Sequence, residues 1–163
     1  MPVPPGTPLH RQTGDAWLEC RCGRRHWGLH GAAGLLLARR AADGHEVLLQ
    51  HRALWSDQGG TWGIPGGALA PDEDPVAGAL REALEEAAVD PAALEVVHTS
   101  VLDHLDWAYT TVVARVTGPQ HPHPADPESL AIVWVATAAV GDLPLLAAFA
   151  DAWPRLRAVV DGG

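Results

Sequence analysis

A glycine-rich stretch that runs directly into a helix start constrains this chain of 163 residues more than any other feature. Residues Trp55 to Gly67 contain five glycines and one proline, which is too glycine-rich for a helix or an interior strand. Beyond it, Asp74 can cap a helix N-terminus, Pro75 suits the first helical turn, and Pro91 marks the helix end. The sequence therefore predicts a structured loop followed by a helix.

The predicted helix separates apolar residues from glutamates. On a helical wheel one face holds Val76, Leu80, Ala83, Leu84 and Ala87. The opposite face holds Glu82, Glu85 and Glu86, which share it through i, i+3 and i+4 spacing. Three carboxylates so close together repel one another, so they form either a solvated acidic surface or a site for a hard divalent cation such as Mg²⁺.

The loop and the glutamates together resemble the signature of the Nudix hydrolase family. That signature reads Gly, five residues, Glu, seven residues, Arg-Glu, an apolar residue, any residue, Glu-Glu, any residue, Gly and an apolar residue. Eight of its nine fixed positions are filled, by Gly67, Glu73, Arg81, Glu82, Ala83, Glu85, Glu86 and Val89. The departure is Ala88 in place of glycine, which costs on the order of 1 kcal/mol if the backbone there is left-handed.

The resemblance implies catalytic and metal-binding roles at particular positions. Glu85 and Glu86 would be metal ligands, and Glu82 would be a ligand or the group that orients or deprotonates water. The carbonyl of Gly66 would complete part of the coordination sphere of Mg²⁺, for which Mn²⁺ can substitute. Family members often recruit a further carboxylate from a loop outside the signature, and Glu128 is our candidate, with plain surface as the alternative.

Other residues would support the site without carrying chemistry. The resemblance implies that Gly67 is structural and that Glu73 and Arg81 form an ion pair linking the loop to the helix. From its position beside the glutamates, Arg81 could instead contact a phosphate. Weaker candidates for the further acid or base lie in one predicted turn; they are Asp103, His104 and Asp106.

Three residues outside the acidic face are candidates for substrate binding. Arg52 follows a predicted strand and precedes the glycine-rich loop, so its guanidinium can reach a phosphate. Trp62 and Trp107, like Trp55, lie in segments that could border a pocket and stack on a base. The alternatives are a surface arginine and tryptophans that pack in the core.

The remaining pattern predicts an α+β chain with a flexible tail over residues 1–15 and one domain over residues 16–163. Predicted strands are Trp17 to Cys22, His26 to Trp27, Ala32 to Leu37, Glu46 to Gln50, Leu94 to Leu105, Trp107 to Val116 and Ile132 to Val135. A loop over Gly118 to Pro127 and a terminal helix over Leu145 to Val160, kinked at Pro154, complete the prediction. The resemblance implies the Nudix fold, an α/β/α sandwich with a central mixed β-sheet and a catalytic loop-helix-loop.

The charge balance limits the partners. Twenty acidic residues outnumber eleven arginines, lysine is absent, and the formal net charge is −9. Tight binding to duplex nucleic acid requires a positively charged surface, which this composition does not supply. An anionic substrate would need metal ions or suitably placed arginines to offset the repulsion. No apolar run approaches a membrane span and no targeting peptide is visible, so we expect a cytoplasmic protein. The oligomeric state stays open, with a homodimer among the options.

Cys20 and Cys22 are the only cysteines. With His26 and His30 they make the pattern Cys-x-Cys-x3-His-x3-His, whose thiolates and imidazoles are zinc ligands. Cys-x-Cys is a poor match to the usual zinc spacing, which favours a hairpin with small buried thiols. Whether these four residues bind zinc is left open.

The family resemblance implies Mg²⁺-dependent hydrolysis of a diphosphate linkage in a nucleoside diphosphate joined to another group. An oxidised nucleoside triphosphate is the leading substrate, with ADP-ribose or another nucleotide sugar next. A Nudix-like module that senses a nucleotide without cleaving it is the alternative from another class. The intact carboxylates argue against that module, since a sensor could lose them freely.

Overall fold

The structure, a computed structural model, describes residues 14–163. Most of the predicted tail lies outside these described residues. Its last two residues, Gly14 and Asp15, are buried, and the Gly14 carbonyl accepts hydrogen bonds from the amides of Ala16 and Leu29 at 3.0 Å. The chain is therefore packed against the rest of the protein from Gly14 onward.

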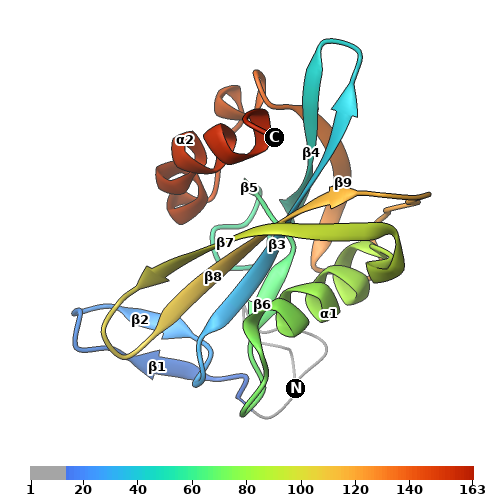
Figure 1. Cartoon of the computed structure of the whole chain (residues 1–163). Coiled ribbons are helices and arrows are strands. Elements are labelled where there is room, and N and C mark those ends of the chain that lie inside the picture. Colours follow the sequence, from blue (N-terminus) through green and yellow to red (C-terminus); the bar gives the residue numbers. More distant parts are fainter. Residues whose placement is uncertain (1–13) are drawn as a thin grey trace.

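Nine strands and two α-helices make up the described chain (Figure 1). The strands are β1 Trp17–Glu19, β2 Arg25–Trp27, β3 Ala32–Ala41, β4 Gly44–Arg52, β5 Trp62–Gly63, β6 Gly66–Ala68, β7 Leu94–Asp103, β8 Ala108–Val116 and β9 Ser129–Ala136. The helices are α1 Pro75–Ala87 and α2 Ala147–Asp161, with 3₁₀ turns at Pro91–Ala93 and Val140–Asp142. None of the described helices is both long and apolar enough to cross a membrane.

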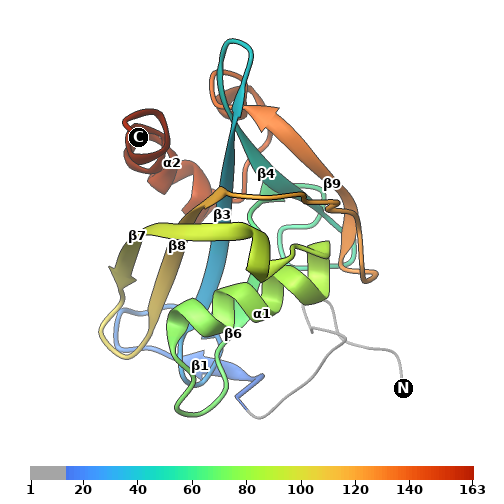
Figure 2. The same ribbon diagram turned by 45° about the vertical axis from the view of Figure 1, so that its right-hand side comes forward.

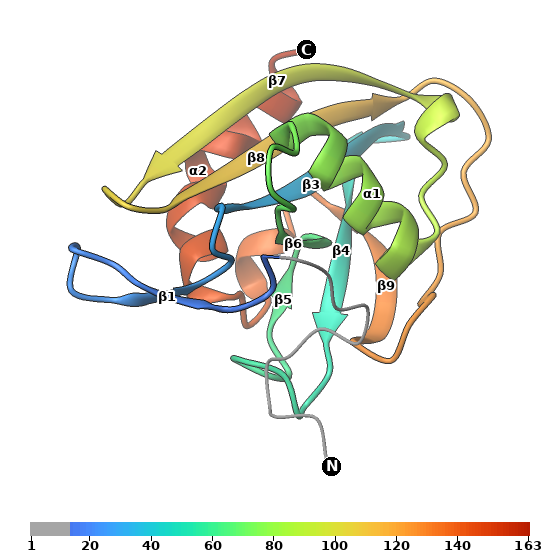
Figure 3. The same cartoon turned by 90° about the horizontal axis from the view of Figure 1, so that it is seen from below.

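The main sheet is mixed, as predicted, and it lies between the two helices. Its strands run in the order β5-β4-β3-β8-β7, with β6 added to β3 and β9 added to β4. The pairing of β3 with β8 is parallel and the other pairings are antiparallel. Helix α1 covers one face and α2 the other, which confirms the α/β/α sandwich (Figures 2 and 3). Strands β1 and β2 form a separate hairpin.

Alternation along the central strand β3 divides the core in two. Leu35 and Leu37 pack on the side of α1, whereas Leu36 packs on the side of α2 with Trp153. Because successive strand residues point to opposite faces, a strand covered on both faces must be apolar throughout. This is why the buried part of β3, Ala32 to Ala38, is an unbroken apolar run, and the same holds for the buried Val47 to Leu49 segment of β4.

The glycine-rich segment was predicted as a loop, but it contains the short strands β5 and β6. Gly66 of β6 lies opposite Gly34 of β3, and a Cβ at Gly66 would approach the Gly34 Cα to 2.7 Å. Glycine at both positions allows this close backbone approach, so the feature that argued against a strand is what lets β6 join the sheet.

The predicted faces of α1 were partly wrong. Glu82 and Leu84 stand one residue to either side of Ala83, which is fully buried. The structure buries the Glu82 side, with Glu82 9% and Glu86 4% exposed, and leaves Leu84 50% exposed. The predicted apolar face included Leu84 and left out Ala79, whereas the sheet-facing surface consists mainly of small residues and two of the glutamates. Those small residues are Gly78, Ala79, Ala83 and Ala87.

Ala88 ends α1 in the left-handed conformation, with φ 56° and ψ 33°. Its amide donates to the carbonyls of Ala83 and Leu84. A residue with a Cβ is strained there, so glycine should be preferred. We expect Ala88→Gly to raise the free energy of unfolding by about 0.5–1 kcal/mol, measured by urea denaturation.

The matched control is Ala77→Gly, an exposed position within α1, where added backbone freedom should lower stability by about 0.5–1 kcal/mol. A less stable Ala88→Gly variant would contradict the helix end described above.

Candidate active site

The buried carboxylate of Glu86 lies where α1, β4 and β6 meet. Its Oε2 accepts hydrogen bonds from the Gln50 side-chain amide at 3.2 Å and from the Gly66 backbone amide at 3.1 Å. Gln50 also donates to the Ser129 hydroxyl at 2.8 Å, which ties the same group to β9. The glycine loop, the sheet and the helix therefore fix the position of Glu86 together.

Two further carboxylates reach Glu86 from the segment before β9. Oxygen atoms of Glu86, Asp126 and Glu128 all lie within 4.8 Å of one another. Backbone hydrogen bonds hold this segment in place, because the amides of His123 and Ala125 donate to the last carbonyls of α1 at 3.0 Å. The structure thus brings Glu128 to the signature glutamates. It adds Asp126, which the sequence analysis missed, although an acidic residue two positions before Glu128 was a usable signal.

Burial and like charge make these carboxyls hard to ionise. Burial raises the pKa of Glu82 to about 7, Arg81 opposes the shift, and Glu85 adds to it. Burial also raises the pKa of Glu86 well above its ordinary value, with further contributions from Glu82 and Glu128. A cluster of this kind is relieved by a cation, since a nearby positive charge favours the ionised form of each carboxyl.

Arg81 forms five hydrogen bonds, all to residues of the loop and the helix. It bonds Glu73 through Nε at 2.8 Å and Nη2 at 2.9 Å, the Ala68 carbonyl at 3.2 Å, Glu82 at 3.0 Å and Glu85 at 3.4 Å. A guanidinium has five N–H donors, so none is left for a phosphate in this arrangement. The ion pair that the resemblance implied is present, and it links the loop to the helix.

Gly67 lies directly against Glu82. A Cβ built at Gly67 would stand 2.7 Å from the Glu82 carboxylate carbon, closer than real contacts allow. Glycine therefore leaves the space that the carboxylate of Glu82 occupies beside β6.

Two of the candidate substrate-binding residues lie on neighbouring strands, Arg52 on β4 and Trp62 on β5. Arg52 sits at the end of β4, opposite Ser129 of β9, and its guanidinium donates to the Asp57 carbonyl at 3.0 and 3.1 Å. Trp62 stacks on His51 with ring centroids 4.3 Å apart. Each of these groups borders the loop between β4 and β6, so their placement is compatible with a substrate role and does not by itself assign one.

Trp107 lies on the loop between β7 and β8, beside the β1–β2 hairpin. It stacks on His26 at 4.3 Å, and its indole donates to the Trp27 carbonyl at 3.1 Å. Tyr109 connects it to the carboxylates, because its ring is 6.1 Å from that of Trp107 and its hydroxyl would meet a Cβ on Gly66 at 3.0 Å. Burial and the neighbouring Glu86 raise the pKa of Tyr109.

The weaker alternatives for an acid or base lie away from the glutamates. Asp106 pairs with Arg21 at 2.7 Å, and Asp103 accepts from the Leu105 amide at 2.8 Å within its own turn. His104 packs against His26 at 4.7 Å. Asp106 and His104 contact the β1–β2 hairpin, and none of the three belongs to the carboxylate cluster.

The donor set fits a hard divalent cation. The groups that converge are carboxylate oxygens, which Mg²⁺ and Mn²⁺ prefer, and three of them lie close enough to share one ion. The residues that would hold it are Glu86, Asp126 and Glu128, with Glu82 and Glu85 on the same helix.

Comparison with known proteins agrees with this fold. The family model of the NUDIX domain matches residues 28–157, so the chain belongs to the Nudix hydrolase family. A nucleoside triphosphate pyrophosphatase/Nudix hydrolase fusion protein of Bifidobacterium longum is 49% identical over 165 residues, covering 98% of this chain and 34% of that protein. A putative 8-oxo-dGTP diphosphatase 3 of Mycobacterium tuberculosis is 48% identical over 154 residues, covering 90% of this chain and 70% of that protein.

Solved structures agree as well. RenU, a Nudix hydrolase from M. smegmatis, superposes with a TM-score of 0.81 at 44% identity, covering 90% of this chain and 94% of that chain. An Ap4A hydrolase of C. elegans shares the fold, with a TM-score of 0.67 at 23% identity, covering 81% of this chain and 99% of that chain. The present chain spans about a third of the B. longum fusion protein.

The Glu73–Arg81 pair should stabilise the protein in a pH-dependent way. Arg81 holds the pKa of Glu73 below its ordinary value. The ion pair therefore adds its full share to the free energy of unfolding above the pKa that Glu73 has in the unfolded chain. This share is lost as the pH falls through the lowered pKa of the folded protein. We expect Glu73→Gln to lower the free energy of unfolding by on the order of 2 kcal/mol at pH 7, and by progressively less below about pH 4.

The check is a double-mutant cycle of Glu73→Gln and Arg81→Gln, measured by urea denaturation at several pH values. Two results would show that the ion pair contributes nothing to stability. One is that the two single variants lower the free energy of unfolding additively at pH 7, and the other is that the loss caused by Glu73→Gln does not become smaller in acid.

Proposed function

We propose that this protein is a Mg²⁺-dependent hydrolase that cleaves the diphosphate linkage of a nucleoside diphosphate joined to another group, with an oxidised purine nucleoside triphosphate as its substrate. The convergence of Glu86, Asp126 and Glu128, with the charge of the buried Glu82 close by, carries the proposal. A solvated acidic surface would not bury two carboxyls beside the sheet, because burial without a compensating charge is costly.

The chain's own residues supply positioning and proton transfer. A bound Mg²⁺ would neutralise the diphosphate and lower the pKa of an attacking water. Glu86 is held by Gln50 and Gly66 as a ligand of fixed orientation. Glu128 is close enough to Glu86 to exchange a proton with it, so its carboxylate is our general base for the attacking water.

The substrate class rests on relatives and on the aromatic residues. One relative at 48% identity carries the name 8-oxo-dGTP diphosphatase, and that activity is what we transfer to this chain as a hypothesis. Trp62 and Trp107 are our candidates for stacking on a purine. Arg52 is our candidate for contacting a phosphate, because Arg81 uses all its donors within the loop and the helix.

Hydrolysis should require Mg²⁺ and the buried glutamate. We expect the wild-type protein to convert 8-oxo-dGTP to the monophosphate and pyrophosphate, and Glu86→Gln to lower kcat by about 10²-fold or more. Product formation is followed by chromatography with Mg²⁺, with Mn²⁺ and with a chelator, against dGTP, ADP-ribose and a dinucleoside tetraphosphate.

Glu95→Gln, an exposed glutamate on β7, is the matched control and should keep full activity. Undiminished turnover by Glu86→Gln would contradict the proposed site. Faster cleavage of ADP-ribose than of 8-oxo-dGTP would overturn the proposed substrate class but not the proposed site. Nucleotide-induced thermal stabilisation without turnover of any substrate would favour a sensing module.

A further inference from the structure

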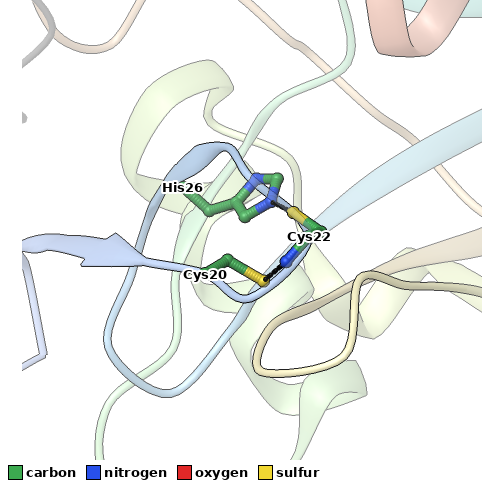
Figure 4. A group of neighbouring side chains, drawn as sticks. All are labelled: Cys20, Cys22 and His26. Carbon is green, nitrogen blue, oxygen red and sulfur yellow. Dashed lines mark hydrogen bonds between the residues drawn. The ribbon is translucent and has the colours of Figure 1, made fainter.

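A second cluster of metal-ligating side chains lies on the β1–β2 hairpin, away from the carboxylates. The ligand atoms of Cys20, Cys22 and His26 all lie within 4.8 Å of one another, and Cys22 Sγ is 3.2 Å from His26 Nε2 (Figure 4). Two thiols and an imidazole are borderline-soft ligands, a different chemistry from the oxygen cluster at α1.

The hairpin turn forms this cluster by its own geometry. The sequence predicted a strand through Cys22, but β1 ends at Glu19 and both cysteines lie in the turn. The Gly23 amide donates to the Cys20 carbonyl at 3.0 Å, and Gly23 takes φ +89°, which a residue with a Cβ rarely adopts. The turn brings both sulfurs to one side, where His26 returns on β2.

Contacts from a neighbouring loop hold the cluster in place. Trp107 stacks on the His26 ring with an interplanar angle of 6°, and Cys20 Sγ donates to the His104 carbonyl at 2.6 Å. The Cys22 amide lies 3.5 Å from Cys20 Sγ. This amide directs an N–H at the sulfur, as metal-bound thiolates favour, whereas the bond from the Cys20 thiol to the His104 carbonyl is one that a metal would replace. The three side chains are therefore preorganised.

His30, the fourth residue of the sequence pattern, is not part of the cluster. It is exposed, and its ring lies near Gly14 instead, with Cδ2 3.1 Å from the position of a Cβ there. Among the described residues, no other His, Cys, Asp or Glu ligand atom joins the three at the same mutual distance. A tetrahedral ion would thus have three protein ligands and one water.

We propose that Cys20, Cys22 and His26 bind a zinc ion. Zn–S bonds of about 2.3 Å and Zn–N bonds of about 2.0 Å place tetrahedral ligand atoms roughly 3.5–3.8 Å apart. Cys22 Sγ and His26 Nε2 are 3.2 Å apart, and Cys20 Sγ lies within 4.8 Å of both, so small side-chain shifts complete the geometry. The ion ties the turn to β2 and fixes the ring against which Trp107 stacks. The proposal is independent of the hydrolase activity, because it involves none of the α1 carboxylates.

Cobalt substitution tests this site without relying on activity. The full-length protein, with both thiols kept reduced by a phosphine and counted with a thiol reagent, is titrated with Co²⁺. We expect one Co²⁺ per chain to give a thiolate-to-metal charge-transfer band in the near ultraviolet, and Zn²⁺ to abolish it. Excess Mg²⁺ should leave the band unchanged, since the acidic site offers oxygen ligands only.

Variants locate the ligands. Cys20→Ser, Cys22→Ser and His26→Ala should each weaken or abolish the band, and His30→Ala, the matched control, should retain it. The wild-type band identifies thiolate ligation even if a ligand variant fails to fold. Zn²⁺ should also raise the Tm of the wild type and of His30→Ala.

Two outcomes would overturn the proposal. The first is the absence of a thiolate band in wild-type protein with two counted thiols. The second is that His30→Ala weakens the thiolate band as much as His26→Ala does, because the geometry assigns His30 no part in binding.

Discussion

Two glutamates of like charge are buried side by side against the sheet, and most of the site follows from how that burial is tolerated. Helix α1 can approach β3 and β6 closely because its sheet-facing residues are small, with Ala79, Ala83 and Ala87 fully buried. Glu82 and Glu86 are carried into the same space. Left without compensation, their charges would cost several kcal/mol, which is why their pKa values rise.

Compensation comes from two directions. Arg81 gives every donor it has to the loop and the helix, so it neutralises charge on one side of Glu82. On the other side, Gln50 and the Gly66 amide direct N–H groups at Glu86. Asp126 and Glu128 bring further carboxylates to within 4.8 Å of Glu86. We infer that a divalent cation provides the remainder, which links the stability of this region to catalysis.

The sequence predicted the parts of this arrangement that depend on local spacing. Glycines before a capped helix, and glutamates at i, i+3 and i+4, are set by chain geometry, and the family signature assigned them roles. The central strands were also predictable, because burial on both faces demands an unbroken apolar run. The cap at Asp74 was read correctly for the same local reason, since its side chain accepts from the Ala77 amide.

Features that depend on tertiary approach were not predictable. Leu84 and Glu82 are equivalent on a wheel centred on Ala83, and only the position of the sheet decides which is buried. Gln50 and Asp126 join Glu86 from strands and loops far along the chain. In the β1–β2 hairpin the local prediction itself was wrong, because Cys20 and Cys22 lie in a turn and not in the predicted strand. His30 was placed in the candidate zinc pattern on its spacing alone, and it is not part of the cluster.

A crystal structure with Mn²⁺, located by its anomalous scattering, tests the role of the buried glutamates most directly. We predict an anomalous peak between α1 and residues 126–128, about 2.0–2.3 Å from carboxylate oxygens of Glu86 and its neighbours. Manganese bound at high occupancy elsewhere, with no peak beside Glu86, would contradict the central claim that these carboxylates are buried to hold a catalytic cation.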